Sequence, residues 1–388
     1  MGLAVTELDL RDFRSYESCR LSGLGRLTLL VGPNAVGKTN VVEALQLCTA
    51  ISSFRNPKPA HLVRMGASSA WAKVTLEDEF RHLELELRVS DEGKGYLLNG
   101  KKRTGASCKG LLPAVLFCPD DLDLVKGSSS VRRHQLDSLG SQVSSGYRAV
   151  LRDYEKIVQQ KNRYLKEQAS WDFLVAINEV LARVGAQLFI LRARLVGELA
   201  PYVTENYAEI ASGRDVVTLA LVPSWEQDSD PRPVDEFRLE RNQVEALILE
   251  ALSRRQFEER ERRRCLVGPH ADKIMFFLEG GDASVFASQG QQRSIVLALK
   301  MAEVMLVRDR LGQTPVLLLD DVMSELDSDR RSAFMSGIPF GVQTFVTATN
   351  LGYFEKELIA DADVVSLNTE DGSRLLRFKW DGRRTKGR

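Results

Sequence analysis

The chain has 388 residues, and its 53 Lys and Arg balance its 53 Asp and Glu, so net charge singles out neither a polyanion partner nor a membrane surface. No uncharged apolar run is long enough to span a bilayer and no signal segment opens the chain, so we expect no membrane partner. Five cysteines without a CxxC pair predict reduced, mostly buried thiols in a cytoplasmic protein (Cys19, Cys48, Cys108, Cys118, Cys265).

The strongest local signal follows a short apolar run at residues 27–31, which predicts a buried parallel strand. A phosphate-binding loop comes next, before a helix predicted over 40–50: Gly32, Pro33, Asn34, Ala35, Val36, Gly37, Lys38 and Thr39. The glycines let the backbone wrap around an anion, and the helix N-terminus adds partial positive charge. Lys38 is predicted to contact the β- and γ-phosphates of ATP, and Thr39 to bind Mg²⁺.

The middle of the chain changes from alternating to helical periodicity. Residues 71–98 alternate strongly, with turns at 91–95 and 99–100, and predict an antiparallel subsheet. Helices are predicted over 147–168, 171–212 and 234–264. We therefore predict a head made of residues 1–143 and 265–388, with an inserted helical lobe at 144–264. Residues 101–168 hold 13 Lys and Arg against 7 Asp and Glu, which suits either a phosphate-binding face or an ordinary solvated surface.

An apolar run at 316–319 ends in Asp320 and Asp321. Carboxylates are tolerated at the carboxyl end of a buried strand, where open α/β sheets bind ligands. We predict that Asp320 holds Mg²⁺ and that Asp321 is the base for the attacking water, so that these two and Lys38 form the catalytic set. Because related ATPases often carry Glu at the second position, the shorter Asp321 predicts slow hydrolysis. The alternative is an acidic pair that caps the following helix.

A second candidate anion site precedes an apolar helix predicted over 294–306. Its residues are Ser288, Gln289, Gly290 and Gln291, and as an isolated string they fit a polar helix cap better than an anion site. Their position shortly before the acidic strand favours the nucleotide site of an ATP-binding-cassette head. Asp327 lies where two such heads would contact each other across a dimer. Thr347 or Thr349, after the last core strand, is a candidate sensor of the γ-phosphate.

Taken together, these segments resemble the RecF family of bacterial recombination mediators, nearly from end to end. The resemblance rests on residues 10–16, 32–40, 119–127, 132–137, 266–270, 288–293 and 317–327. It implies an α/β ABC-ATPase head with an antiparallel β-subsheet and a short helical arm. It also implies a weak, DNA-stimulated ATPase that dimerises on ATP and binds single-stranded and gapped duplex DNA.

By the same resemblance, the partners are RecR- and RecO-type mediators and a RecA-type recombinase, in repair, replication-fork recovery and SOS induction. Two departures concern local contacts: Ser129 stands where the family usually has Pro, and residues 271–273 (Ala-Asp-Lys) replace a more acidic Arg-containing segment. Both are expected in loops.

Two other classes of ATPase stay open. A transporter subunit is disfavoured, because no glutamine follows the middle strands, no histidine follows the last core strand, and the helical insertion is large. An SMC- or RecN-like structural ATPase is disfavoured by an insertion at 144–264 that is too short for a long coiled coil.

Overall fold

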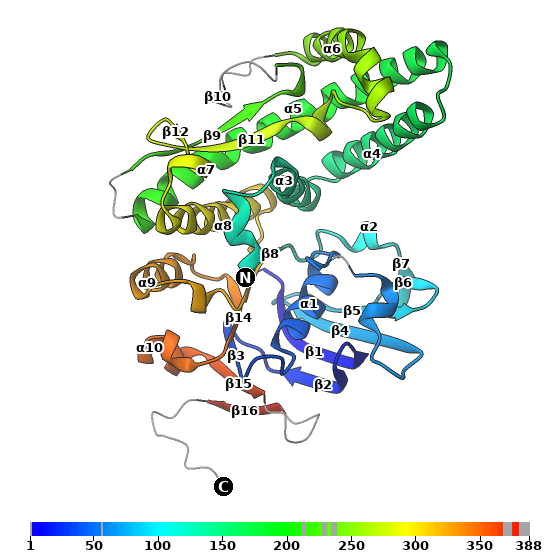
Figure 1. The fold of residues 1–388 in the computed structure, drawn as a ribbon. Helices are drawn as coiled ribbons and strands as arrows, with labels where there is room; N and C mark the ends of the chain where they lie inside the picture. The colour runs from blue at the N-terminus through cyan, green and yellow to red at the C-terminus, as the bar shows by residue number, and fades with distance from the viewer. Residues whose placement is uncertain are drawn as a thin grey trace. The chain divides into compact units, whose positions relative to one another are not determined.

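The computed structural model describes residues 2–55, 57–211, 215–226, 231–233, 239–367 and 375–379, without the side chains of 232–233 and 375–379 (Figure 1). The chain divides into two compact units, residues 1–121 with 303–388, and residues 122–302. The second unit is larger than the predicted lobe at 144–264. It gains residues on both sides for two reasons. Helix α3 (Ser129–Val143) packs on α4 (Ser145–Lys166) and α5 (Trp171–Ile210), and strand β11 (Lys273–Leu278) pairs with β9 (Val217–Val222).

The first unit contains a mostly parallel sheet in the order β16-β15-β3-β14-β13-β8, in which only β16 is antiparallel. Its strands are β3 (Leu27–Val31), β8 (Ala114–Phe117), β13 (Val316–Asp320), β14 (Gln343–Ala348), β15 (Asp363–Leu367) and β16 (Leu375–Lys379). The strands from β8 to β3 are apolar and buried on both faces, as parallel strands require. Because β3, β14 and β13 are neighbours, their carboxyl ends meet at one edge. This edge brings together segments from opposite ends of the chain.

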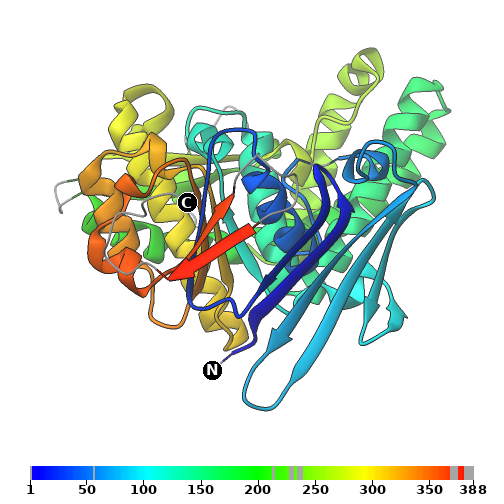
Figure 2. The same cartoon turned by 90° about the horizontal axis from the view of Figure 1, so that it is seen from below.

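The same unit contains an antiparallel sheet in the order β2-β1-β4-β5-β6-β7. Its strands are β1 (Ala4–Phe13), β2 (Tyr16–Ser22), β4 (Ser69–Glu77), β5 (His82–Ser90), β6 (Gly93–Leu98) and β7 (Lys101–Arg103). The predicted hairpins are present, and the second turns through Asn99 and Gly100, both with positive φ. Helix α1 (Lys38–Thr49) packs against strands of both sheets, and one apolar core joins them (Figure 2).

The remaining helices of this unit are short: α2 (Gly105–Cys108), α9 (Ser328–Gly337) and α10 (Lys356–Asp361). The boundary between the units falls within α8 (Gln289–Leu311). All five cysteines are free and buried, which agrees with the prediction from their spacing.

The second unit is a set of helices beside a small sheet. Its helices are α3 (Ser129–Val143), α4 (Ser145–Lys166), α5 (Trp171–Ile210), α6 (Arg241–Arg262) and the short α7 (Ala283–Phe286). The sheet order is β10-β9-β11-β12, from β9 (Val217–Val222), β10 (Arg232–Pro233), β11 (Lys273–Leu278) and β12 (Gly281–Asp282). Among the described helices, α5 alone is long and apolar enough to cross a membrane. It packs instead on α4, α6 and β9 as a core helix.

The core of the second unit contains a buried polar cluster around Arg192 of α5. The guanidinium donates to both carboxylate oxygens of Asp137 at 3.0–3.1 Å and to the carbonyl of Pro269 at 2.6 Å. It also lies 3.8 Å from the carboxylate of Asp272, which is fully buried and accepts from the backbone N–H of Ser224. Asp272 lies in a connection between a 3-10 turn (Pro269–Ala271) and the next strand (Lys273–Leu278), as predicted, but it is buried, and its carboxylate helps to neutralise a buried arginine.

Three predicted segments extend beyond the described residues, one of them the helix predicted over 171–212, whose last residue is outside the described part. The charged helix predicted over 234–264 begins at Arg241, and residues 234–238 are outside the described part. The basic tail at 383–388 lies outside it as well.

Candidate nucleotide site

The loop between β3 and α1 has the backbone geometry of an anion-binding turn. Ala35 and Gly37 adopt positive φ, at 64° and 108°, and Gly37 begins the helix without a side-chain cap. A Cβ on Gly37 would lie 2.8 Å from the hydroxyl of Tyr16, and a Cβ on Gly32 would overlap the carbonyl oxygen of Leu367. Glycine is therefore required at both positions by its surroundings. The N–H of Asn40 donates to the carbonyl oxygen of Gly37 at 2.9 Å, so within the described residues the N–H groups of Lys38 and Thr39 are left for a ligand.

Lys38 is the first residue of α1 and its ammonium lies inside the loop. Nζ donates to the carbonyl oxygens of Gly32 at 2.7 Å and Pro33 at 2.9 Å. Burial lowers the pKa of Lys38, and the nearby carboxylates of Asp321 and Asp320 oppose that shift. The predicted phosphate-binding lysine and the predicted acidic pair come from opposite ends of the chain and are thus electrostatic neighbours in one unit.

The end of β13 is tied to the end of β14 by one hydroxyl group. Thr347 Oγ1 donates to Asp320 Oδ1 at 2.9 Å and accepts from the N–H of Asp321 at 2.8 Å. Burial raises the pKa of Asp320, while hydrogen bonds from Thr347 and Thr39 oppose the shift. Thr347 is fully buried, and its hydroxyl both donates one hydrogen bond and accepts one. It is therefore placed to orient the acidic pair, and of the two threonines only Thr349 is partly exposed.

The hydroxyl of Thr39 and the carboxylate of Asp320 form a set of hard oxygen donors beside the loop. Oxygen donors of this kind are what Mg²⁺ prefers, so the residues present fit the predicted ion. Asp321 adopts φ of 55°, and its Oδ1 is buried with no hydrogen-bond partner among the described residues. An unsatisfied buried acceptor is costly, which suggests that this oxygen serves a bound group.

An ion-pair cluster behind the loop was not apparent from the sequence. Glu43 of α1 is fully buried and receives two hydrogen bonds of 2.8 Å from Arg14 and one of 2.6 Å from Ser53. Arg55 lies 3.7 Å from the same carboxylate, donates to Asn40 at 3.2 Å, and lowers the pKa of Asp320. Arg55 is 40% exposed and belongs to no motif, so only the fold identifies it as a cation at the site.

The second candidate anion segment belongs to the other compact unit. Ser288 and Gln291 form a reciprocal cap at the start of α8, with Ser288 Oγ accepting from Gln291 N at 3.3 Å and Gln291 Oε1 accepting from Ser288 N at 2.9 Å. The helix-cap interpretation thus describes the local structure, and Ser288 and Gln289 are exposed. Asp327, in the first unit, caps α9 and pairs with Arg330.

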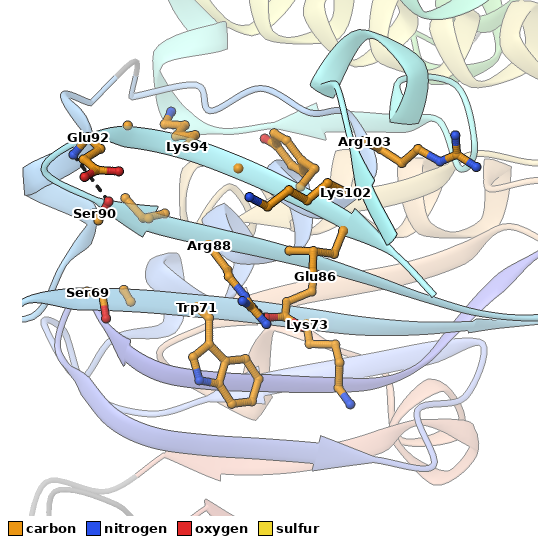
Figure 3. A pocket seen from close by; sticks show the side chains of 16 residues that line it. Ser69, Trp71, Lys73, Glu86, Arg88, Ser90, Glu92, Lys94, Lys102 and Arg103 are labelled. Atoms are coloured by element: carbon orange, nitrogen blue, oxygen red, sulfur yellow. Dashed lines mark hydrogen bonds and ion pairs between the residues drawn. The ribbon is translucent and has the colours of Figure 1, made fainter. Parts of the chain in front are cut away.

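A separate hollow of about 870 Å³ lies at the antiparallel sheet (Figure 3). None of residues 32–39, Asp320 or Asp321 lines it, so it is separate from the candidate nucleotide site. Figure 3 shows Lys94 on β6, Lys102 and Arg103 on the edge strand β7, and Trp71 on β4. Two further cations in the hollow are neutralised, since Arg88 pairs with Glu86 at 2.6 Å and Lys73 with Glu84 at 3.1 Å.

Comparisons with known proteins agree with this architecture. Residues 4–370 match the model of the RecF/RecN/SMC N-terminal domain family. The DNA replication and repair protein RecF of Symbiobacterium thermophilum is 38% identical over 352 residues, 89% of this chain and 92% of that protein. RecF of Staphylococcus epidermidis is 33% identical over 376 residues, 94% of this chain and 98% of that protein.

Solved structures give the same result. The recombination mediator RecF in its ATPrS form superposes with a TM-score of 0.86 at 26% identity, covering 97% of this chain and 98% of that one. An Smc head bound to the C-terminal winged-helix domain of ScpA, with a TM-score of 0.57 at 16% identity and coverage of 97% and 98%, shares the fold. The predicted α/β head of the ABC-ATPase class is confirmed, and the chain belongs to the RecF family.

Proposed function

We propose that this protein is an ATP-dependent switch that dimerises on ATP and binds DNA during replication and repair. The observation that carries the proposal is the assembly of Lys38, Thr39 and Asp320 at one sheet edge, while Ser288 belongs to the other unit. Relatives named as DNA replication and repair proteins, and a RecF structure with ATP, support the same assignment. ATP would bind on the loop, with Mg²⁺ held by Thr39 and Asp320.

Hydrolysis would reset the switch, with Asp321 as the base for the attacking water. The buried Oδ1 of Asp321 has no hydrogen-bond partner among the described residues and is therefore free to accept a proton from water. The short side chain of Asp321 is consistent with slow hydrolysis. Lys38→Ala should abolish ATP binding in a filter or fluorescence assay, and Asp321→Asn should retain binding but lose turnover. A turnover of tens per second in the isolated protein would contradict the switch.

The second half of each ATP site would come from a partner chain, through Ser288, Gln289, Gly290 and Gln291, with Asp327 at the same dimer contact. Ser288→Arg should keep ATP binding and prevent ATP-dependent dimerisation in sedimentation velocity. Ser288 is exposed, so the variant should fold normally.

Mixing two variants distinguishes a partner-completed site from a self-completed one. In a mixed dimer of Lys38→Ala and Ser288→Arg chains, one site combines an intact Lys38 with an intact Ser288 from the other chain, and the second site carries both defects. Partial recovery of ATPase activity on mixing is therefore expected. If each chain completed its own site, both sites would remain defective and mixing would recover nothing.

DNA contacts are proposed at the basic hollow of the antiparallel sheet. Lys94, Lys102 and Arg103 form no ion pair within the described residues, so their charges are available to phosphates. Replacing Lys102 and Arg103 by Glu should weaken DNA binding and lower the slope of affinity against salt by about two, one for each phosphate contact. An unchanged slope would remove the hollow from the proposal.

The preferred DNA is proposed to be a single-strand gap in duplex, where the protein would support loading of a RecA-type recombinase with RecR- and RecO-type partners, and SOS induction. The alternative is a structural ATPase of the SMC or RecN type, and a transporter subunit is a more distant one. Stimulation of ATPase activity by gapped DNA, but not by membranes or transport substrates, would support the switch. No stimulation by any form of DNA would contradict it.

A further inference from the structure

The end of α4, the start of α5 and the second half of α6 meet within the second unit (Figure 1). Side chains from these three segments form an exposed apolar patch. Phe173 is 61% exposed, Val175 53% and Phe257 70%, while Trp171 is 37% exposed. The rings form two contacting pairs, with centroids 5.4 Å apart for Trp171 and Phe257 and 6.0 Å apart for Tyr164 and Phe173. We refer to these five side chains as the arm patch.

Single exposed apolar residues are common on protein surfaces and need no explanation. Exposed apolar residues that lie together are less common, and they mark interaction sites. The exposed side chains do not contribute to the core of the unit, since the buried Leu174 and Ile177 of the same helix already fill the interior. No described element covers Phe173 or Phe257. The patch is therefore available to another molecule.

The α6 side of the arm patch carries excess positive charge, whereas the exposed Asp172 stands between Trp171 and Phe173 on α5. Residues 254–264 contain six Arg and three Glu. The carboxylate of Glu259 forms a buried ion pair with Lys161 at 2.6 Å. The carboxylate of Glu258 pairs with both Arg255 at 2.9 Å and Arg262 at 3.0 Å. Arg260, Arg263 and Arg264 form no ion pair within the described part of the chain. The Arg260 guanidinium lies over the Trp171 ring, 4.4 Å from its centroid.

From this combination we infer that the arm patch binds an acidic peptide segment with aromatic or aliphatic side chains, presented by a partner protein. The apolar side chains would pack on Phe173, Val175 and Phe257, and the acidic ones would pair with Arg260, Arg263 and Arg264. A single nucleic-acid strand also combines charge with flat rings. The patch suits it poorly, because Arg260 covers the Trp171 face and the rings pack edge to face or tilted, which leaves no row of open faces for stacking.

The test is fluorescence anisotropy with the full-length protein and a fluorescein-labelled peptide of alternating Asp, Phe and Leu. A second peptide with Ser in place of Phe and Leu keeps the charge and removes the apolar groups. The first peptide should bind and the second should not. Phe173→Ser, Phe257→Ser and a double Arg263→Glu, Arg264→Glu change should each weaken binding about tenfold.

Matched controls separate the patch from general effects. Phe80→Ser removes an aromatic ring that is 92% exposed in the other unit, and Arg194→Glu reverses an exposed charge of α5 that has no ion pair among the described residues. Both should leave binding unchanged, and all variants should keep ATP binding.

Three results would overturn the inference. The first is failure of the apolar acidic peptide to bind the wild-type protein, or equal binding by all variants. The second is tighter binding of an oligothymidylate that Phe173→Ser and Phe257→Ser abolish, which would assign the patch to nucleic acid. The third is concentration-dependent self-association in sedimentation that Phe257→Ser removes, which would assign the patch to a second copy of this chain.

Discussion

Thr347→Val tests whether one buried hydroxyl holds the acidic end of β13 in place. The change keeps the shape of the side chain and removes two hydrogen bonds, one to the Asp320 carboxylate and one from the Asp321 N–H. A bond to a charged group contributes about 1.5–3 kcal/mol and a neutral one about 1 kcal/mol. Since Thr39 still bonds Asp320, the lower part of that range applies, and the free energy of unfolding should fall by about 2–3 kcal/mol.

Thr28→Val is the matched control, because Thr28 lies in β3 of the same sheet and is equally buried, but its hydroxyl has no hydrogen-bond partner among the described residues. Removing an unsatisfied polar atom should leave stability unchanged or raise it by about 1 kcal/mol. Urea unfolding gives the free energies, and hydrogen exchange of peptides covering 316–321 and 343–348 locates the loss. Mg²⁺-dependent ATP affinity should fall in Thr347→Val alone. Equal destabilisation by the two changes would show that packing, and not the hydroxyl bridge, fixes this strand end.

Three further changes probe other contacts. Lys161→Met should lower the free energy of unfolding by about 3–5 kcal/mol, because it leaves Glu259 charged and buried, and adding Glu259→Gln should recover most of the loss in urea unfolding. Gly32→Ala should abolish ATP binding in a fluorescence assay, because its Cβ overlaps backbone, whereas Gly95→Ala meets open space and should bind normally. Burial lowers the pKa of His270 to about 4 from 6.5, so its unfolded form takes up a proton first and stability falls as pH drops from 6.5 to 4. His270→Asn should therefore lose less stability than the wild type between pH 7 and pH 5.

Each of these expectations has a contradicting result. Additive losses in the Lys161 and Glu259 double variant would show that the ion pair is not coupled. ATP binding by Gly32→Ala would show that the loop moves freely away from β15. An identical loss of stability on acidification in wild type and His270→Asn would mean that His270 is protonated in the folded protein. The carboxyl of Asp272 acts in the opposite direction, because burial raises its pKa to about 6, so the comparison between variants is the readout.

Contiguous features were predictable from the sequence. The strand, loop and first helix around Gly32 are encoded in one unbroken stretch, and the observed β3 and α1 begin at or close to their predicted positions. The two hairpin turns need residues that adopt positive φ, and the sequence supplies Gly and Asn at these positions. Local chemistry determines such elements, so one segment of sequence is enough to predict them.

Contacts between distant segments were not predictable. The bridge from Thr347 to Asp320 depends on the register of β13 against β14, and the pairing of Arg14 with Glu43 depends on where β1 passes α1. The extent of the second unit follows from β9 pairing with β11, although the whole of α6 lies between these strands in the chain. The burial of Asp272 in its loop was not predictable, because its buried partner, Arg192, is on α5, which comes much earlier in the chain.

The division of the proposed ATP-site motifs between two units has a thermodynamic consequence. Lys38, Thr39 and Asp320 belong to one unit, and under the proposal they bind ATP without Ser288. If Ser288 of a partner then contacts the same nucleotide, ATP binding and dimerisation are linked, and each must strengthen the other by the same factor. The apparent affinity for ATP must therefore rise with protein concentration in the wild type and stay constant in Ser288→Arg. A nucleotide site completed within one chain would show no such dependence in either protein, so a titration at several protein concentrations separates the two arrangements without measuring hydrolysis.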